Sequence, residues 1–207
     1  MGYDWQKRWT DGTTGWDLNG PHPFTSEFLL IIKQKYSDIG RWLVPGCGRA
    51  HDAAYIATHW LNSSGECIVD ATDIIPDAID EAKKLYSMIP NLHLYVDDAL
   101  MLKDNEVGSY DAIFDRAMMC ALDSKSRQTY IENCFAKLRV GGIFISLPFT
   151  KVANPQSGPP FEISPMAFHD LLLPFGNLVF MKELMAESVS SISAIQAEMA
   201  FIFMRRE

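Results

Sequence analysis

Four short stretches of the sequence place glycines or charged side chains directly after an apolar run. The first is Gly46-Cys47-Gly48, which follows the run 41–45, and the others end in Asp73, Asp98 and the pair Asp115-Arg116. Glycines let the backbone turn sharply and let a ligand approach the main chain closely. Carboxylates at such positions accept hydrogen bonds from the hydroxyl groups of a ribose. These residue types therefore predict a site for a nucleotide-type ligand.

The glycine turn is the centre of this pattern. A helical run, 50–61, follows the turn, and the N-terminus of such a helix offers free N–H groups to a carboxylate or phosphate. Asp73 stands 25 positions after Gly48, close to the spacing at which an acid binds the ribose in dinucleotide folds. The third glycine of a dinucleotide fingerprint is missing, because Ala50 and His51 lie where it would be. Asp73 could instead cap the helix that follows it.

The elements between these residues must bring the strand ends to one edge of a sheet. Apolar runs alternate with helical patterns five times, and the chain then continues into two further strands joined by a polar turn. This order predicts an α/β fold, with a doubly wound, mostly parallel sheet of seven strands, helices on both faces and a C-terminal antiparallel pair. The predicted strands are 41–45, 67–74, 92–96, 110–114, 143–149, 177–185 and 193–207. The predicted helices are 27–36, capped by Ser26, and 50–61, 76–86, 124–139 and 166–176, with a loop over 150–165.

Three tryptophans lie near the start of the sequence. Trp5 and Trp9 are four positions apart, so they share one face of a short helix. Trp16 lies in a loop that is rich in Gly, Asp, Asn and Pro. Either this aromatic face docks on the core, or residues 1–24 form a cover over a flat ligand. We expect the cover, as part of one domain that spans 1–207.

Composition narrows the classes of partner. Asp and Glu outnumber Lys and Arg by 26 to 18, the net charge is −8, and the sequence has no basic stripe of the kind that binds nucleic acid. The four cysteines are scattered and form no CxxC pair, as expected of free thiols in a reducing compartment. No secretory signal, membrane-length apolar stretch or metal-ligand motif is visible. We therefore expect a cytoplasmic monomer that binds no metal, nucleic acid or membrane.

With these residues placed, the sequence resembles the class I S-adenosylmethionine-dependent methyltransferases, whose fold is Rossmann-like. Within that class it resembles the thiopurine S-methyltransferase family, and most closely its thiol and halide methyltransferase branch. The resemblance rests on four segments and runs over almost the whole chain: WQKRWTDGTTGWD, LVPGCGRAHD, YDAIFDRAMMCAL and SGPPFEIS. It implies S-adenosyl-L-methionine as cofactor, S-adenosyl-L-homocysteine as product, and a thiol or thiopurine sulfur as the methyl acceptor. Halide and selenium or tellurium compounds are the alternative acceptors, and Arg116 stands where the thiol and halide branch often has Tyr.

The resemblance also implies roles for individual residues. The implied cofactor-binding residues are Trp5, Trp9, Trp16, Gly46, Gly48, Asp73, Asp98, Ala99 and Arg116. Trp16 would lie between cofactor and acceptor, and catalysis would depend on Trp16, Arg116 and Asp115. A small acidic thiol is partly ionised near neutrality, so a dedicated base is not required, and Asp17, His22 and Asp115 are the candidates for one. Two rival interpretations are an NAD-dependent dehydrogenase with the same fold and a non-catalytic S-adenosylmethionine-binding protein.

Overall fold

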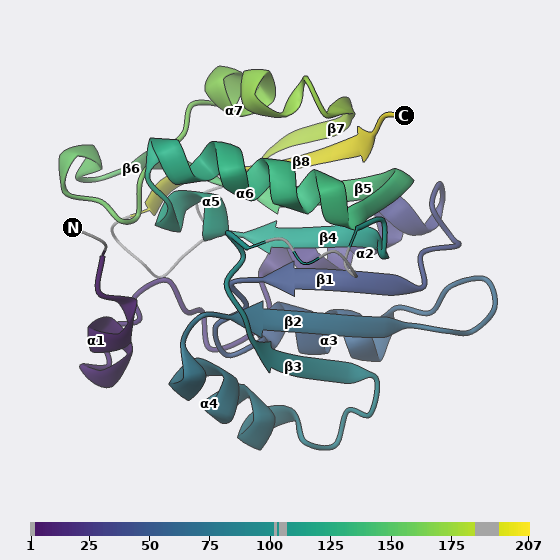
Figure 1. Cartoon of the computed structure of the whole chain (residues 1–207), viewed down its shortest axis with the longest axis horizontal. Coiled ribbons are helices and arrows are strands. Elements are labelled where there is room, and N and C mark those ends of the chain that lie inside the picture. Colours follow the sequence, from purple (N-terminus) through teal and green to yellow (C-terminus); the bar gives the residue numbers. More distant parts are fainter. Residues whose placement is uncertain (1–2, 102, 104–106, 185–194) are drawn as a thin grey trace.

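A single sheet carries the fold, with helices on both of its faces (Figure 1). The computed structural model describes residues 3–101, 103, 107–184 and 195–207. The strands are β1 (Arg41–Pro45), β2 (Ile68–Asp73), β3 (Leu92–Val96), β4 (Tyr110–Arg116), β5 (Leu138–Leu147), β6 (Phe149–Val152), β7 (Gly176–Leu184) and β8 (Ile195–Arg205). The α-helices are α1 (Trp5–Thr10), α2 (Pro23–Lys33), α3 (His51–His59), α4 (Pro76–Tyr86), α5 (Met118–Ala121), α6 (Ser124–Lys137) and α7 (Pro165–Leu172).

The strand order confirms the predicted fold class. The sheet runs β3-β2-β1-β4-β5-β8-β6, and β7 pairs with β8. The first five strands are parallel, and β8 is antiparallel to β5, β6 and β7. The parallel strands therefore end at one common edge, where such sheets bind their ligands.

The described sheet has eight strands where the sequence pattern predicts seven. The fifth predicted strand is divided at Pro148, which has no N–H group for the strand ladder. After the proline, Phe149 pairs with Glu198, while Ser146 before it pairs with Phe201, so β6 and β5 share one edge of β8. The prediction of a loop from residue 150 is consequently wrong for the residues that complete β6.

Successive residues of the central strands face opposite layers of the core, as the two-residue period of a strand requires. Trp42 and Val44 pack with the buried residues of α2 and α3. Leu43, between them, packs with buried residues of α6 and α7. Helices α2 and α3 therefore cover one face of the sheet, and α6 and α7 cover the other.

Helix α2 begins earlier than the sequence pattern predicts. Its first residue is Pro23, and the ring Nδ1 of His22 accepts the Phe24 N–H at 3.1 Å. Proline suits the first position of a helix because its fixed φ is already helical and no N–H is lost there. The prediction that Ser26 caps this helix is wrong, because Ser26 lies within it.

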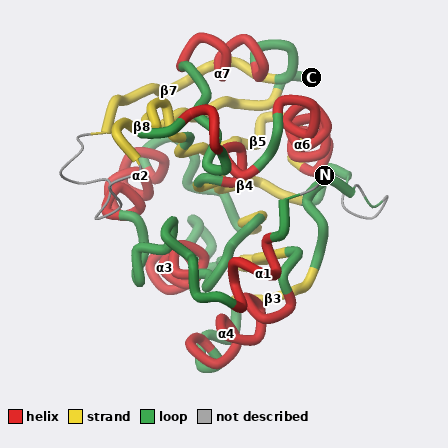
Figure 2. Tube along the Cα trace, turned by 90° about the vertical axis from the view of Figure 1, so that its left-hand side faces the viewer, coloured by secondary structure: helices red, strands yellow, loops and turns green. Residues whose placement is uncertain are grey.

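Figure 2 looks onto the edge at which the parallel strands end, and α1 lies there beside α4. Two side-chain hydrogen bonds join the two helices, from Gln6 to Asp77 at 2.7 Å and from Trp9 to Glu81 at 3.2 Å. Among the helices described, none has both the length and the apolar character needed to cross a membrane.

Candidate active site

A cavity of about 750 Å³ opens at the C-terminal edge of the sheet. Its walls come from the glycine turn after β1, the ends of β2 and β4, the segment after β3 and the N-terminal segment. The structure brings together in these walls every residue that the sequence implied for a cofactor site: Trp5, Trp9, Trp16, Gly46, Gly48, Asp73, Asp98, Ala99 and Arg116. Strand topology accounts for this convergence, because the parallel strands end side by side.

The glycine turn needs its glycines for two different reasons. Gly46 has φ +61° and Gly48 has φ +54°, a left-handed region that is costly for residues with a Cβ atom. A Cβ on Gly46 would lie 2.6 Å from the Met118 sulfur, whereas a Cβ on Gly48 would meet only Trp9, at 4.0 Å. Ala50, at the N-cap of α3, supplies no side-chain acceptor to the first turn of that helix. The N–H groups in the first turn of α3 are therefore available to a ligand.

The carboxylate of Asp73 ties the end of β2 to the glycine turn. Its Oδ2 accepts the Gly48 N–H at 2.9 Å, and its Oδ1 accepts the Ile75 N–H at 3.0 Å. Burial raises the pKa of Asp73 above its usual value, and the two backbone donors oppose that rise. Ile75 is itself the N-cap residue of α4, so Asp73 does not make the N2 or N3 hydrogen bond of a helix-capping aspartate.

Arg116 brings an unpaired cation to the cavity. Its Nη1 donates to the Trp16 carbonyl at 3.2 Å, and its Nε and Nη2 are buried with no hydrogen-bond partner among the residues described. Arg8 also lines the cavity, with its guanidinium 5.7 Å from the centre of the Trp16 ring. Buried donors without partners are costly, so the Arg116 guanidinium retains hydrogen-bonding capacity beside the cavity.

Asp115 lies beneath the cavity and does not line it. Its side chain is fully buried, accepting hydrogen bonds from Ser146 Oγ at 3.0 Å and the Met118 N–H at 2.9 Å. Burial raises the pKa of Asp115 to about 7, and these hydrogen bonds oppose the rise. The prediction that Asp115 acts on substrate is not supported by this placement. Neighbouring residues of a strand point to opposite faces of the sheet, so Arg116 lines the cavity while Asp115 lies on the other face beside its register partner Ser146.

The other two candidate bases are also occupied. Asp17 lines the cavity but forms an ion pair with Arg49, and its Oδ1 lies 3.4 Å from His51 Nε2. Burial alone would raise the pKa of Asp17, but the contact with His51 and the hydrogen bonds from Arg49 and the Asn19 N–H outweigh it and lower the pKa. His22 is buried outside the cavity lining, and its Nε2 lies 3.2 Å from Glu198 Oε2. Because its Nδ1 accepts a backbone N–H, its Nε2 carries the proton and cannot act as a base.

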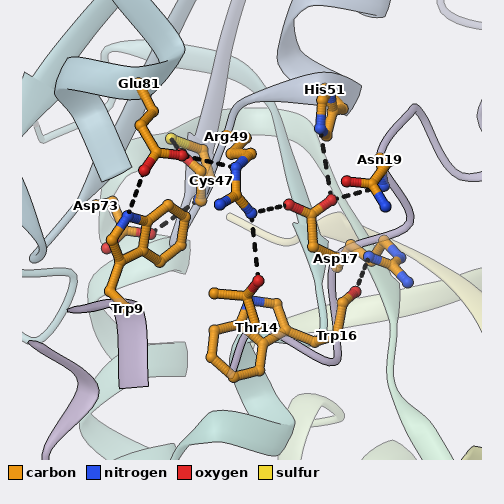
Figure 3. A network of polar contacts seen from close by, with 12 residues as sticks. Trp9, Thr14, Trp16, Asp17, Asn19, Cys47, Arg49, His51, Asp73 and Glu81 are labelled. Atoms are coloured by element: carbon orange, nitrogen blue, oxygen red, sulfur yellow. Dashed lines mark hydrogen bonds and ion pairs between the residues drawn. The ribbon is translucent and has the colours of Figure 1, made fainter. Parts of the chain in front are cut away.

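The three N-terminal tryptophans all line the cavity and differ in how deeply they are buried. Trp9 is buried and packs with Ile75 and Ala78, while Trp5 and Trp16 are half-buried against this cluster. The Trp5 and Trp16 rings meet edge to face, with their centroids 5.4 Å apart. Two of the polar contacts that hold this segment, those of Thr14 and Asp17, are made to Arg49 (Figure 3). The sequence analysis missed Arg49, although its position directly after Gly48 was a signal.

Arg127 is a second residue that the sequence analysis missed. It is buried in α6 and donates to the carbonyls of Met119 at 2.9 Å and Phe161 at 3.3 Å. The Phe161 N–H in turn donates to the Cys120 carbonyl at 2.7 Å. Phe161 and Cys120 both line the cavity, so Arg127 fixes this part of its wall.

Comparisons with known proteins agree with this geometry. The family model described as thiopurine S-methyltransferase matches residues 2–197. Thiocyanate methyltransferase 1 of Brassica oleracea is 29% identical over 175 residues, which are 83% of this chain and 72% of that protein. Probable thiol methyltransferase 2 of Arabidopsis thaliana is 30% identical over the same shares. A thiopurine S-methyltransferase of Xanthomonas campestris pv. campestris is 28% identical over 183 residues, 81% of this chain and 79% of that protein.

Solved structures show the same fold at low sequence identity. The N-methyltransferase NodS of Bradyrhizobium japonicum, in complex with S-adenosyl-L-homocysteine, aligns with a TM-score of 0.72 and 17% identity over 93% of this chain and 92% of its own. A Burkholderia thailandensis N1-methyltransferase with bound S-adenosylhomocysteine aligns with a TM-score of 0.72 and 16% identity over 99% of this chain and 86% of its own. Both support the predicted Rossmann-like methyltransferase fold.

Proposed function

The chain belongs to the thiopurine S-methyltransferase family, and from this membership we propose that it methylates the sulfur atom of a small thiol-type acceptor. The methyl donor is S-adenosyl-L-methionine. Relatives named for thiocyanate, thiols and thiopurines support a small sulfur acceptor. The observation that carries the proposal is one cavity in which the glycine turn, two strand-end carboxylates, an aromatic segment and an unpaired guanidinium meet.

The residues of the cavity fit the cofactor. When bound, S-adenosyl-L-methionine supplies an electrophilic methyl group on a positively charged sulfur. Asp73 has lone pairs left for ribose hydroxyls, and Asp98, at the end of the neighbouring strand, would accept from the adenine amino group. Arg116 has free donors that match a carboxylate. Aromatic faces attract a sulfonium by about 2 kcal/mol when desolvated, which gives Trp5 and Trp16 a role.

The residues of this chain contribute mainly position. Holding two reactants in line lowers such a barrier by roughly 7–11 kcal/mol. Since Asp17, His22 and Asp115 are each engaged elsewhere, we propose that the acceptor enters already ionised. A thiolate is the reactive form of a thiol, and the guanidinium groups of Arg8 and Arg116 favour its approach.

We further propose that residues 1–24 act as a cover that excludes water from the reaction. The support is that Tyr3, Trp5, Arg8 and Trp16 contribute one wall of the cavity. The segment is held by side-chain contacts and a small aromatic cluster, and its described residues, 3–24, contribute no strand to the sheet.

A binding assay and an acceptor panel test the proposal. S-adenosyl-L-homocysteine should raise the melting temperature and NAD should not. Methyl transfer from labelled cofactor should occur to a thiopurine, an aromatic thiol or thiocyanate, but not to the matched alcohols and amines. Transfer to iodide or selenide alone would show that the acceptor class is wrong. Stabilisation by NAD alone, or cofactor binding without transfer to any acceptor, would overturn the enzymatic assignment.

A further inference from the structure

The side chain of Arg49 joins the N-terminal segment to the glycine turn (Figure 3). Its Nε donates to Glu81 Oε2 on α4 at 2.7 Å. Its Nη1 donates to Thr14 Oγ1 at 3.3 Å and forms an ion pair with Asp17 Oδ2. The Arg49 guanidinium therefore links Glu81 on α4 to Thr14 and Asp17 on the cover.

Trp9 is held inside this bridge. The Arg49 guanidinium lies 4.7 Å from the centre of the Trp9 ring. The Trp9 indole N–H donates to Glu81 Oε1 at 3.2 Å, the carboxylate oxygen that Arg49 leaves free. The ring is thus fixed by a cation on its face and by the same glutamate that anchors the cation.

The bridge is sheltered enough to matter energetically. The Asp17 side chain is 9% exposed and that of Arg49 is 23% exposed. Exposed ion pairs contribute little, whereas a guanidinium that satisfies several partners in a partly buried site holds its geometry well. A lysine at this position has one point charge and could not reach both Glu81 and the cover acceptors.

The position of Arg49 in the chain links the cover to the glycine turn, Gly46-Cys47-Gly48. Arg49 directly follows Gly48, whose N–H donates to Asp73 Oδ2. A ligand that engages Asp73 therefore acts on the short turn from which Arg49 projects. Tyr3, Trp5, Arg8 and Trp16 line the cavity in this docked arrangement of the cover.

We propose that Arg49 is a positioning residue that docks residues 3–20 over the cavity and couples this docking to occupation of the glycine turn. The inference rests on the proposed function. Because the partners of Arg49 on the cover are Thr14 and Asp17, we expect the loss of Arg49 to weaken binding of the methyl acceptor more than it lowers the stability of the fold.

The test compares Arg49→Met with Arg139→Met. Arg139 forms one ion pair with Asp111, at the opposite edge of the sheet, so it controls for the general loss of an arginine pair. Two quantities are measured: amide hydrogen exchange of residues 3–20 with and without S-adenosyl-L-homocysteine, and the acceptor KM. In the unaltered chain the product should slow exchange of the segment. In Arg49→Met the exchange should stay fast at saturating product, and the KM should rise by roughly tenfold, the usual effect of one lost charged hydrogen bond. Arg139→Met should behave as the unaltered chain, and Arg49→Lys should restore only part of the protection.

A second variant approaches the same contact from the other side. Asp17→Asn leaves Arg49 and Glu81 in place, and it should also remove the protection gained on product binding. Wild-type protection of residues 3–20 in both variants would overturn the inference, as would a segment that is equally protected with and without product in the unaltered chain. Failure of the unaltered chain to bind product or transfer methyl groups would instead refute the proposed function.

Discussion

The Asp73 carboxylate holds the turn through two backbone hydrogen bonds and keeps lone pairs for a ligand. Its two oxygens already accept the N–H groups of Gly48 and Ile75, yet each carboxylate oxygen has a second lone pair. A ribose can therefore bind without displacing the backbone donors. The same side chain that shapes the turn remains able to recognise the ligand.

We predict that Asp73→Asn weakens S-adenosyl-L-homocysteine binding at least roughly tenfold, since a hydrogen bond to a charged group contributes about 1.5–3 kcal/mol. Calorimetric titration measures the loss. Asp111→Asn is the matched control, because Asp111 also accepts two backbone N–H groups, those of Gly40 and Arg41, far from the cavity. It should lower the melting temperature and leave the affinity unchanged. If Asp73→Asn does the same, Asp73 only holds the turn.

A second prediction concerns the buried carboxyl of Asp115. Its folded pKa of about 7 lies above the usual 3.8, so between these values the folded chain binds a proton that the unfolded chain has released. This contribution to the free energy of unfolding is greatest at low pH, falls as pH rises from about 4 to about 7, and is constant above that. Asp115→Asn should therefore gain stability relative to the unaltered chain as pH rises. Urea titrations from about pH 5 to about pH 8 measure this difference, and a pH-independent difference would contradict the prediction.

The strand-end residues that line the cavity could be predicted from the sequence, whereas contacts that depend on distant partners could not. Asp73, Asp98 and Arg116 follow from the topology of a parallel sheet. Arg49 acts through Glu81 and two residues of the cover, none of them near it in sequence. Asp115 was misassigned because nothing local tells which of two adjacent strand residues faces the cavity.

At the scale of elements, the glycine turn depends on α5 as well as on its own backbone. Substitution of either glycine by alanine should lower the free energy of unfolding by about 1–2 kcal/mol, because both have positive φ. Only at Gly46 would the new Cβ also meet Met118. We predict that Gly46→Ala combined with Met118→Ala destabilises less than the sum of the single variants, while Gly48→Ala and Met118→Ala are additive. Urea unfolding of the five variants measures the coupling, and additivity in both pairs would contradict the contact.

The elements themselves were largely predictable, because hydrophobic period and glycine or proline punctuation are local signals. Two of the departures from the predicted elements occur at prolines. Pro23 begins α2 where the pattern predicted Ser26 as the cap. Pro148 divides the fifth predicted strand without ending its pairing, because β8 is long enough to pair with the strands on both sides of the proline. The residues around 148 do not indicate how long β8 is, so this pairing could not be predicted from them.

At the scale of the whole molecule, the two ends of the described chain have opposite importance for stability. β8 lies between β5 and β7 and buries Phe201 and Phe203 completely. Among residues 3–20 of the cover, one side chain, that of Trp9, is buried, in a small cluster at the rim. Stability should therefore depend strongly on β8 and weakly on the cover, while catalysis depends on both.

We predict that deleting residues 1–16 preserves a cooperative unfolding transition and abolishes methyl transfer. Deleting residues 195–207 should abolish the transition itself, because three strands lose their shared partner. Circular dichroism during heating distinguishes the two outcomes. Loss of cooperative unfolding in the N-terminal deletion would show that the tryptophans are core residues and not a cover.

Because β8 comes last among the strands of the sequence, its three partner strands are synthesised before it. The strands whose ends form the cofactor side of the cavity, β1 to β4, are synthesised first, and they pair among themselves. β5, β6 and β7 follow, each with an edge reserved for a strand that has not yet been made. Unpaired strand edges readily pair with other chains, and pairings between distant segments form slowly. The nascent chain therefore exposes three such edges until residues 195–205 emerge.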